Sequence, residues 1–143
     1  MRDRKRLCGK ALALGLTSTL LSSGVFAELN GKTNLLCSAD QVVGCVDKEC
    51  LQGPPSTFGL PHFMFIDFER KVIHGVDDEG EELTSPIKNM EINEAAFILQ
   101  GFENNRGWTM GVNPKDGGLT MSSTGADVNF IITGNCIERS GGK

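Results

Sequence analysis

Hydrophobic and polar residues alternate with a period of two through the second half of the chain. In GWTMGVN, Trp108, Met110 and Val112 share one parity, and Thr109 and Gly111 separate them. GLTMSS and DVNFIITGNC repeat the alternation further along. Because successive side chains of a strand point to opposite faces of a sheet, each of these segments is predicted to bury one face and expose the other.

Turn-forming sequences recur every ten to thirteen residues or so and separate these segments, a rhythm typical of an antiparallel all-β domain joined by hairpins. The most specific turn is NPKDGG, where Pro114 suits the second position and a glycine can take a positive φ. Pro86 predicts that the fourth strand is broken, bulged or at an edge. The pattern predicts about eight strands, near residues 33–38, 62–68, 71–77, 82–91, 96–103, 107–112, 118–123 and 127–135.

We therefore predict a small up-and-down meander, closed or nearly closed into a barrel, with a two-layer β-sandwich as the alternative. Residues 39–61, which include GPPSTFGLP, are expected to form a disulfide-stapled loop near the N-terminus of the domain and no regular element. Residues 28–143 are expected to form a single domain.

The N-terminal residues have the form of a secretory signal. Five Lys or Arg within MRDRKRLCGK precede the apolar run ALALGLTSTLL, and SSGVFA follows it. This pattern predicts cleavage after Ala27. The apolar run is too short to span a bilayer, so no membrane anchor is predicted. The expected location is periplasmic or secreted, in a bacterial host.

Removal of this segment leaves Cys37, Cys45, Cys50 and Cys136, an even number as expected for a disulfide framework in an exported domain. Their gaps fit neither the paired spacing of a structural zinc site nor the two-residue gap of a thioredoxin-type motif. Four cysteines allow three pairings, and the sequence alone does not choose among them. We predict Cys45–Cys50, which closes a small local loop, and Cys37–Cys136, which fits a closed barrel because its first and last strands are neighbours.

Composition narrows the range of partners. Residues 28–143 contain nine Lys or Arg and seventeen Asp or Glu, a net charge of minus eight. This charge disfavours nucleic acid and anionic lipid surfaces and favours a basic protein partner.

The acidic run DDEGEE is the one candidate for a cation site. Asp77, Asp78, Glu79 and Glu81 are its weak calcium candidates, although the run lacks the register of the common calcium loop. A solvated hairpin tip is the simpler interpretation. No metal and no cofactor are predicted.

Catalytic motifs do not stand out. No G-x-S-x-G nucleophile elbow, phosphate loop or dinucleotide fingerprint is present. If Glu69 and Arg70 form a tight turn, His62 and His74 point to opposite faces of the sheet and share neither a metal nor a proton. An enzyme using His62, Asp67 and His74 is therefore the least favoured hypothesis, and we expect a non-enzymatic protein.

Two binding hypotheses remain. The leading one is a module of the bacterial envelope that binds a protein partner through loops and sheet surface, as inhibitors and immunity proteins do. The alternative is a carrier of one small apolar ligand, since some eight-stranded barrels keep a cavity. The predicted inward side chains that would line such a cavity are Trp108, Met110, Met121 and Phe130. In a solid barrel the same side chains fill the core. The oligomeric state is left open.

Overall fold

The computed structural model describes residues 28–139, and the predicted signal segment, residues 1–27, lies outside the described residues. The regular elements of residues 28–139 are nine strands and one short 3-10 helix, η1. Their bounds are β1 (Leu35–Val46), β2 (Glu49–Gly53), η1 (Pro55–Phe58), β3 (Phe63–Asp67), β4 (Val72–Val76), β5 (Glu82–Ile92), β6 (Phe97–Glu103), β7 (Arg106–Val112), β8 (Gly118–Thr124) and β9 (Asn129–Glu138).

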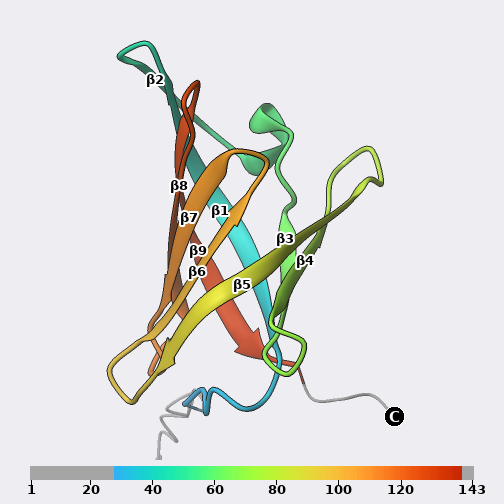
Figure 1. Cartoon of the computed structure of the whole chain (residues 1–143), viewed down its shortest axis with the longest axis vertical. Coiled ribbons are helices and arrows are strands. Elements are labelled where there is room, and N and C mark those ends of the chain that lie inside the picture. The colour runs from blue at the N-terminus through green and yellow to red at the C-terminus, as the bar shows by residue number, and fades with distance from the viewer. Residues whose placement is uncertain (1–27, 140–143) are drawn as a thin grey trace, which may run out of the picture.

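Eight of the strands close into an antiparallel barrel, which confirms the predicted barrel in place of the sandwich. The hydrogen-bonded order is β2-β1-β3-β4-β5-β6-β7-β8-β9, and an additional pairing of β1 with β9 closes the ring. Figure 1 shows this ring, with β2 continuing beyond it at the top. Closure gives every strand of the ring a partner on both sides over at least part of its length.

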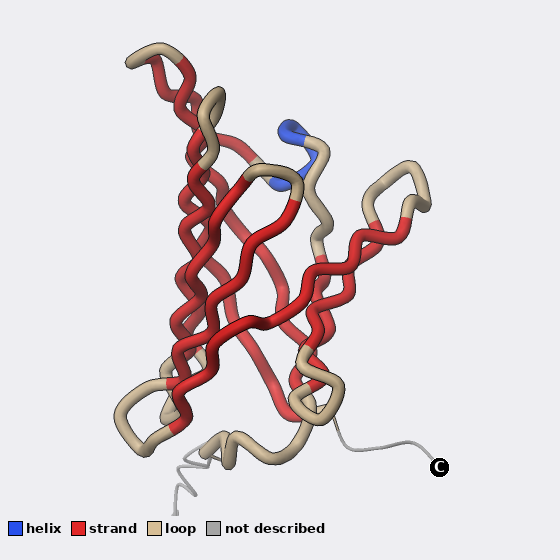
Figure 2. Tube along the Cα trace, viewed as in Figure 1, coloured by secondary structure: helices blue, strands red, loops and turns tan. Residues whose placement is uncertain are grey.

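The long strand β1 organises the closure. Its first residues pair with β3, its last residues pair with β2, and its other edge pairs with β9 along most of its length. The prediction of a loop over residues 39–61 was therefore wrong in its first part, because β1 and β2 form a regular hairpin. Figure 2 shows that hairpin as strand at the top of the molecule, with η1 as the short helical turn beside it.

Both predicted disulfides are present. Cys37 lies directly opposite Cys136 in the β1–β9 ladder, and their Cα atoms are 4.0 Å apart. Cys45 lies directly opposite Cys50 in the β1–β2 hairpin, with a Cα–Cα distance of 4.1 Å. Each disulfide therefore joins two neighbouring strands, and the first ties the beginning of the barrel to its end.

The barrel has two different ends. The β1–β2, β4–β5, β6–β7 and β8–β9 turns lie at one end, which we call the upper end as in Figure 1, and the β3–β4, β5–β6 and β7–β8 turns lie at the lower end. The lower half is filled by large side chains with almost no exposed surface. These include Leu35, Ile66, Phe97, Leu99, Met110 and Val112.

Strand β5 runs through Pro86 without a break. Pro86 lies opposite Val72 of β4, and the β-bulge in the β5–β6 pairing comes just afterwards, between Ile87 and Asn89. Pairing with β6 begins at Ile87, so the upper half of β5 is a local edge where Pro86 removes no ladder hydrogen bond. Across residues 28–139, no helix is long and apolar enough to cross a membrane.

Candidate functional site

The upper half of the barrel contains a cavity of about 220 Å³. Its lining is mainly apolar and comes from strands all round the ring and from the loop that follows η1. The side chains that give it this character are Leu60, Met64, Ile73, Trp108, Met121 and Ile132.

Small inward residues explain why this half of the barrel is hollow. Ala39, Gly75, Ser85 and Ser123 occupy inward positions of β1, β4, β5 and β8 and line the cavity. The corresponding positions lower in the barrel carry large aliphatic and aromatic side chains. Since eight strands enclose a space just wide enough for side chains to fill, a layer of small residues leaves room for a ligand.

Trp108 forms part of the cavity wall where β5 and β6 separate. These strands pair from Ile87 and Gly101 downward, and above that point the ladder between them stops. The indole Nε1 of Trp108 donates a hydrogen bond of 2.8 Å to Ser85 Oγ on β5. The ring therefore spans the opening between the two strands, and its polar edge has a partner, as a buried tryptophan requires.

Gly101 makes this position of the indole ring possible. A Cβ atom at residue 101 would overlap the Trp108 ring and lie 2.6 Å from the carbonyl oxygen of Pro86. The glycine is thus required by close approach of the ring and the neighbouring strand.

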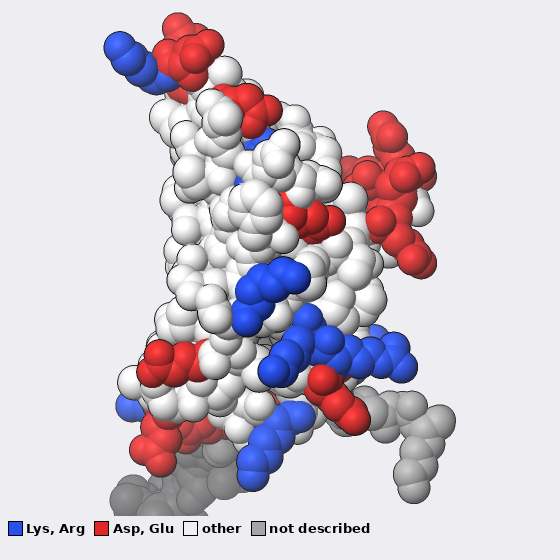
Figure 3. Space-filling view, viewed as in Figure 1, with Lys and Arg blue, Asp and Glu red and all other residues white. Residues whose placement is uncertain are grey.

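The turns at the upper end carry most of the net negative charge. Residues 46–49, 77–82, 103–106 and 125–128 contain nine Asp or Glu and two Lys or Arg, whereas the rest of residues 28–139 contains eight and six. Figure 3 shows a large acidic group on the β4–β5 hairpin at the right, and Lys and Arg side chains lower on the same face. The upper end of the barrel therefore attracts a cation more strongly than an anion.

Glu103 and Arg106 line the cavity from the end of β6 and the start of β7, at the upper end of the barrel, and we call this end of the cavity its opening. The guanidinium of Arg106 donates to Asp127 Oδ1 at 3.2 Å and to the carbonyl oxygen of Val128 at 3.1 Å. It also lies 5.4 Å from the centre of the Phe130 ring. Arg106 thus joins the β6–β7 and β8–β9 turns, and the carboxylate of Asp127 balances its charge.

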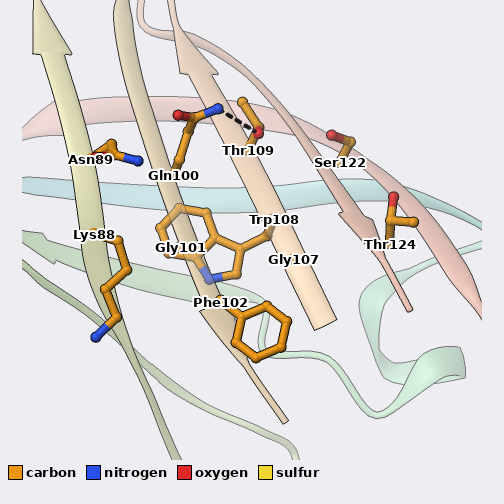
Figure 4. A pocket seen from close by; sticks show the side chains of 10 residues that line it. All are labelled: Lys88, Asn89, Gln100, Gly101, Phe102, Gly107, Trp108, Thr109, Ser122 and Thr124. Atoms are coloured by element: carbon orange, nitrogen blue, oxygen red, sulfur yellow. Dashed lines mark hydrogen bonds between the residues drawn. The ribbon is translucent and has the colours of Figure 1, made fainter. Parts of the chain in front are cut away.

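An outer depression of about 450 Å³ lies on the other side of the same wall, over β5 to β8. Figure 4 shows its polar side chains, among them Gln100, whose amide donates to Thr109 Oγ1 at 3.4 Å. Phe102 is 58% exposed beside this depression, and Trp108 contributes to its lining as well as to that of the cavity. The indole ring therefore separates an apolar inner space from a more polar outer one.

The four predicted cavity residues divide into three groups. Trp108 and Met121 line the cavity. Met110 points inward but is fully buried in the filled half below it. Phe130 packs edge-to-face against Phe58, with ring centres 5.8 Å apart, and lines a separate depression beside the β1–β2 hairpin.

Three residues of the cavity lining were not predicted from the sequence: Glu103, Arg106 and Ser123. Their inward parity could have indicated them, because Glu103 continues the alternation of Leu99 and Gly101 along β6. Their position at the upper end depends on the direction of each strand in the closed ring, which the alternation alone does not give.

The acidic run 77–82 includes the β4–β5 turn. Asp77 Oδ1 accepts hydrogen bonds from the backbone N–H groups of Glu79 at 3.0 Å and Glu81 at 2.9 Å. One carboxylate oxygen of Asp77 is therefore used to hold the turn, and the other acidic residues of the turn are exposed. Among residues 28–139, no group of three or more His, Cys, Asp or Glu side chains is arranged to hold a metal ion.

The three residues of the enzyme hypothesis have separate environments. His74 points outward from β4, stacks on Phe65 at 6.5 Å between ring centres, and lies 3.2 Å from Thr84 Oγ1 through Nδ1. Asp67 accepts a hydrogen bond from the N–H of Arg70 in the β3–β4 turn at the lower end. His62 is exposed in the segment before β3. Phe65 and His74 lie directly opposite each other in the β3–β4 ladder.

Comparison of the sequence with models of known protein families gives no match, and a search of curated proteins finds none that matches it.

Proposed function

We propose that this protein is an exported, non-enzymatic binding module of the bacterial envelope that holds one small apolar ligand in the upper half of its barrel. The observation that carries the proposal is the cavity of about 220 Å³. It is lined mainly by apolar side chains and lies in the half of the barrel where several inward residues are small. Barrels of eight strands are wide enough to hold one small ligand in this way. Ligand sites in proteins are commonly such apolar spaces with a few polar groups at defined positions.

Export is supported by the two disulfides and by the predicted secretory signal. Disulfides persist in oxidising compartments such as the periplasm and the extracellular space. We accordingly propose a periplasmic or secreted location.

Trp108 provides a direct test of ligand binding. It is the single tryptophan, and the chain contains no tyrosine, so intrinsic fluorescence reports on one side chain that lines the cavity. Titration with an uncharged aromatic probe, 2-phenylethanol, should give a saturable change in the emission of Trp108.

A matched pair of variants locates the binding site. Ser123→Leu places extra volume in the cavity from β8, and Thr120→Leu places the same side chain on the outer face of the same strand. We expect Ser123→Leu to weaken binding at least about tenfold, since a filled cavity has no room for the probe, and Thr120→Leu to bind like the wild type. Circular dichroism establishes that both variants fold. Equal binding by the two variants, or a response that does not saturate, would contradict the proposal.

A protein partner is the second candidate, and the charge of the upper end favours it. The upper turns carry nine acidic and two basic residues, and the β1–β2 hairpin beside them exposes Val46 (50%) and Leu51 (61%). An acidic surface with exposed apolar side chains is complementary to a basic protein with an apolar patch.

Charge reversal tests the second candidate. Asp78→Lys combined with Glu79→Lys should slow association with such a partner, and Glu91→Lys combined with Glu94→Lys, near the lower end, should not. The wild-type association rate should also fall as salt rises, because surface charges are screened. A partner that binds both double variants equally well would contradict an interface at the upper end.

A further inference from the structure

Glu103 is the carboxylate that lies at the opening of the cavity. It continues the inward parity of β6, is half-buried, and occupies the last position of that strand. Within residues 28–139, the ion pairs are Arg70–Asp67 and Arg106–Asp127, so the charge of Glu103 is not balanced by either of these arginines.

The neighbouring side chain of Arg106 does not cancel the negative potential around Glu103. Arg106 lies directly opposite Glu103 in the β6–β7 ladder, but its guanidinium is directed to Asp127 and to the carbonyl oxygen of Val128. The remaining charge of the upper turns is strongly negative. An apolar space beneath an acidic opening concentrates this field, because the low-dielectric walls screen it poorly.

The size of the cavity limits the ligand. An apolar cavity of about 150 Å³ holds a benzene molecule, and this cavity has a volume of about 220 Å³. By simple proportion, a ligand of roughly nine non-hydrogen atoms fits, which is an aromatic ring with a short side chain.

We propose that the ligand is a small amphiphilic cation, with an apolar body inside the cavity and an ammonium group at the opening near Glu103. This inference rests on the proposed ligand-binding function and adds the chemical class of the ligand. Contact of the ammonium with a half-buried carboxylate is a charge-assisted interaction, stronger than one between neutral groups.

Three probes of similar size and different charge test the inference: phenylethylammonium, 2-phenylethanol and phenylacetate. We expect phenylethylammonium to bind about tenfold more tightly than 2-phenylethanol, as measured by Trp108 fluorescence, and phenylacetate to bind most weakly. The advantage of the cation should shrink as salt is added, whereas binding of the alcohol should not change in this way.

Glu103→Gln is the decisive variant, because it removes the charge and keeps the shape. It should remove most of the preference for the cation and leave the affinity for 2-phenylethanol unchanged. Glu94→Gln, in the turn at the lower end, is the matched control and should retain the preference. Equal affinity for all three probes, or a preference that Glu103→Gln leaves undiminished, would overturn the cation inference while ligand binding stands. Failure of every probe to bind would overturn the proposed function itself, and the inference with it.

Discussion

At the scale of single residues, small side chains shape the candidate site more than large ones do. Ala39, Gly75 and Ser123 leave the upper half of the barrel open, and Gly101 lets the indole of Trp108 lie against β6. The alternation in the sequence predicted that Trp108 and Met121 face the inside of the barrel. It could not predict that they line a cavity, because alternation gives the face on which a side chain lies and not the volume around it.

Replacement of Gly101 by alanine should be unusually harmful for so small a change. The new Cβ would overlap the Trp108 ring and approach the carbonyl oxygen of Pro86, so we expect a loss of about 1–3 kcal/mol in the free energy of unfolding. Urea denaturation measures this loss. Gly111→Ala on β7 is the control, since its Cβ would find its nearest neighbours at 3.7 and 3.9 Å and should leave stability nearly unchanged. Equal effects of the two variants would show that the contact with Trp108 is unimportant.

At the scale of elements, the β1–β2 hairpin is the feature that the sequence did not predict. Its turn residues, Asp47 and Lys48, both have positive φ, at 47° and 76°, as the tight two-residue turn requires. Lysine is a poor signal for such a turn, because glycine or asparagine is usual there. A signal was nevertheless available. If Cys45 and Cys50 lie directly opposite each other, the residues between them must form a hairpin with a two-residue turn.

Lys48→Gly should therefore stabilise the protein. Glycine relieves the unfavourable left-handed conformation, and we expect a gain of about 0.5–1 kcal/mol, less than the strain itself because glycine also loses more freedom on folding. Asn105→Gly, at the equivalent position of the β6–β7 turn with φ of 59°, should gain less, since asparagine tolerates this conformation. Thermal unfolding of the oxidised variants provides the comparison, and a larger gain from Asn105→Gly would contradict this explanation.

At the scale of the whole molecule, the prediction of a closed ring was confirmed by the pairing of β1 with β9 and by the disulfide that bridges them. The number of alternating segments led to this prediction, and the closed ring in turn favoured the pairing of Cys37 with Cys136. The charge distribution could not be predicted in the same way, because the acidic turns meet at one end only once the ring is closed.

The two disulfides should differ in both reactivity and contribution to stability. Cys37 and Cys136 are buried, whereas Cys50 is exposed and Cys45 partly so. A mild thiol reductant acting on the folded protein should free Cys45 and Cys50 for alkylation, and the other pair should react only after unfolding, because exchange requires access to the sulfur. Peptide mapping identifies the labelled residues, and early labelling of Cys37 would contradict this order.

The loss of unfolding free energy on removing each disulfide should increase with the length of the loop that the disulfide closes. The loop-entropy model gives about 4.7 kcal/mol for a loop of about 100 residues and about 2 kcal/mol for a loop of a few residues. Cys37→Ala with Cys136→Ala should therefore reduce the free energy of unfolding more than Cys45→Ala with Cys50→Ala, as denaturation of the two double variants would measure. The reverse order would contradict the loop-entropy explanation for these two disulfides.

The tied ends of the barrel have a further consequence. The N–H of Arg139, just after β9, donates a hydrogen bond of 2.8 Å to the carbonyl oxygen of Asn34, just before β1, so the two ends of the ring are adjacent in space. A short peptide could join them, and new termini could open at the exposed β4–β5 tip. The order in which the strands are synthesised would then be rearranged by circular permutation, while each strand kept its neighbours in the finished barrel.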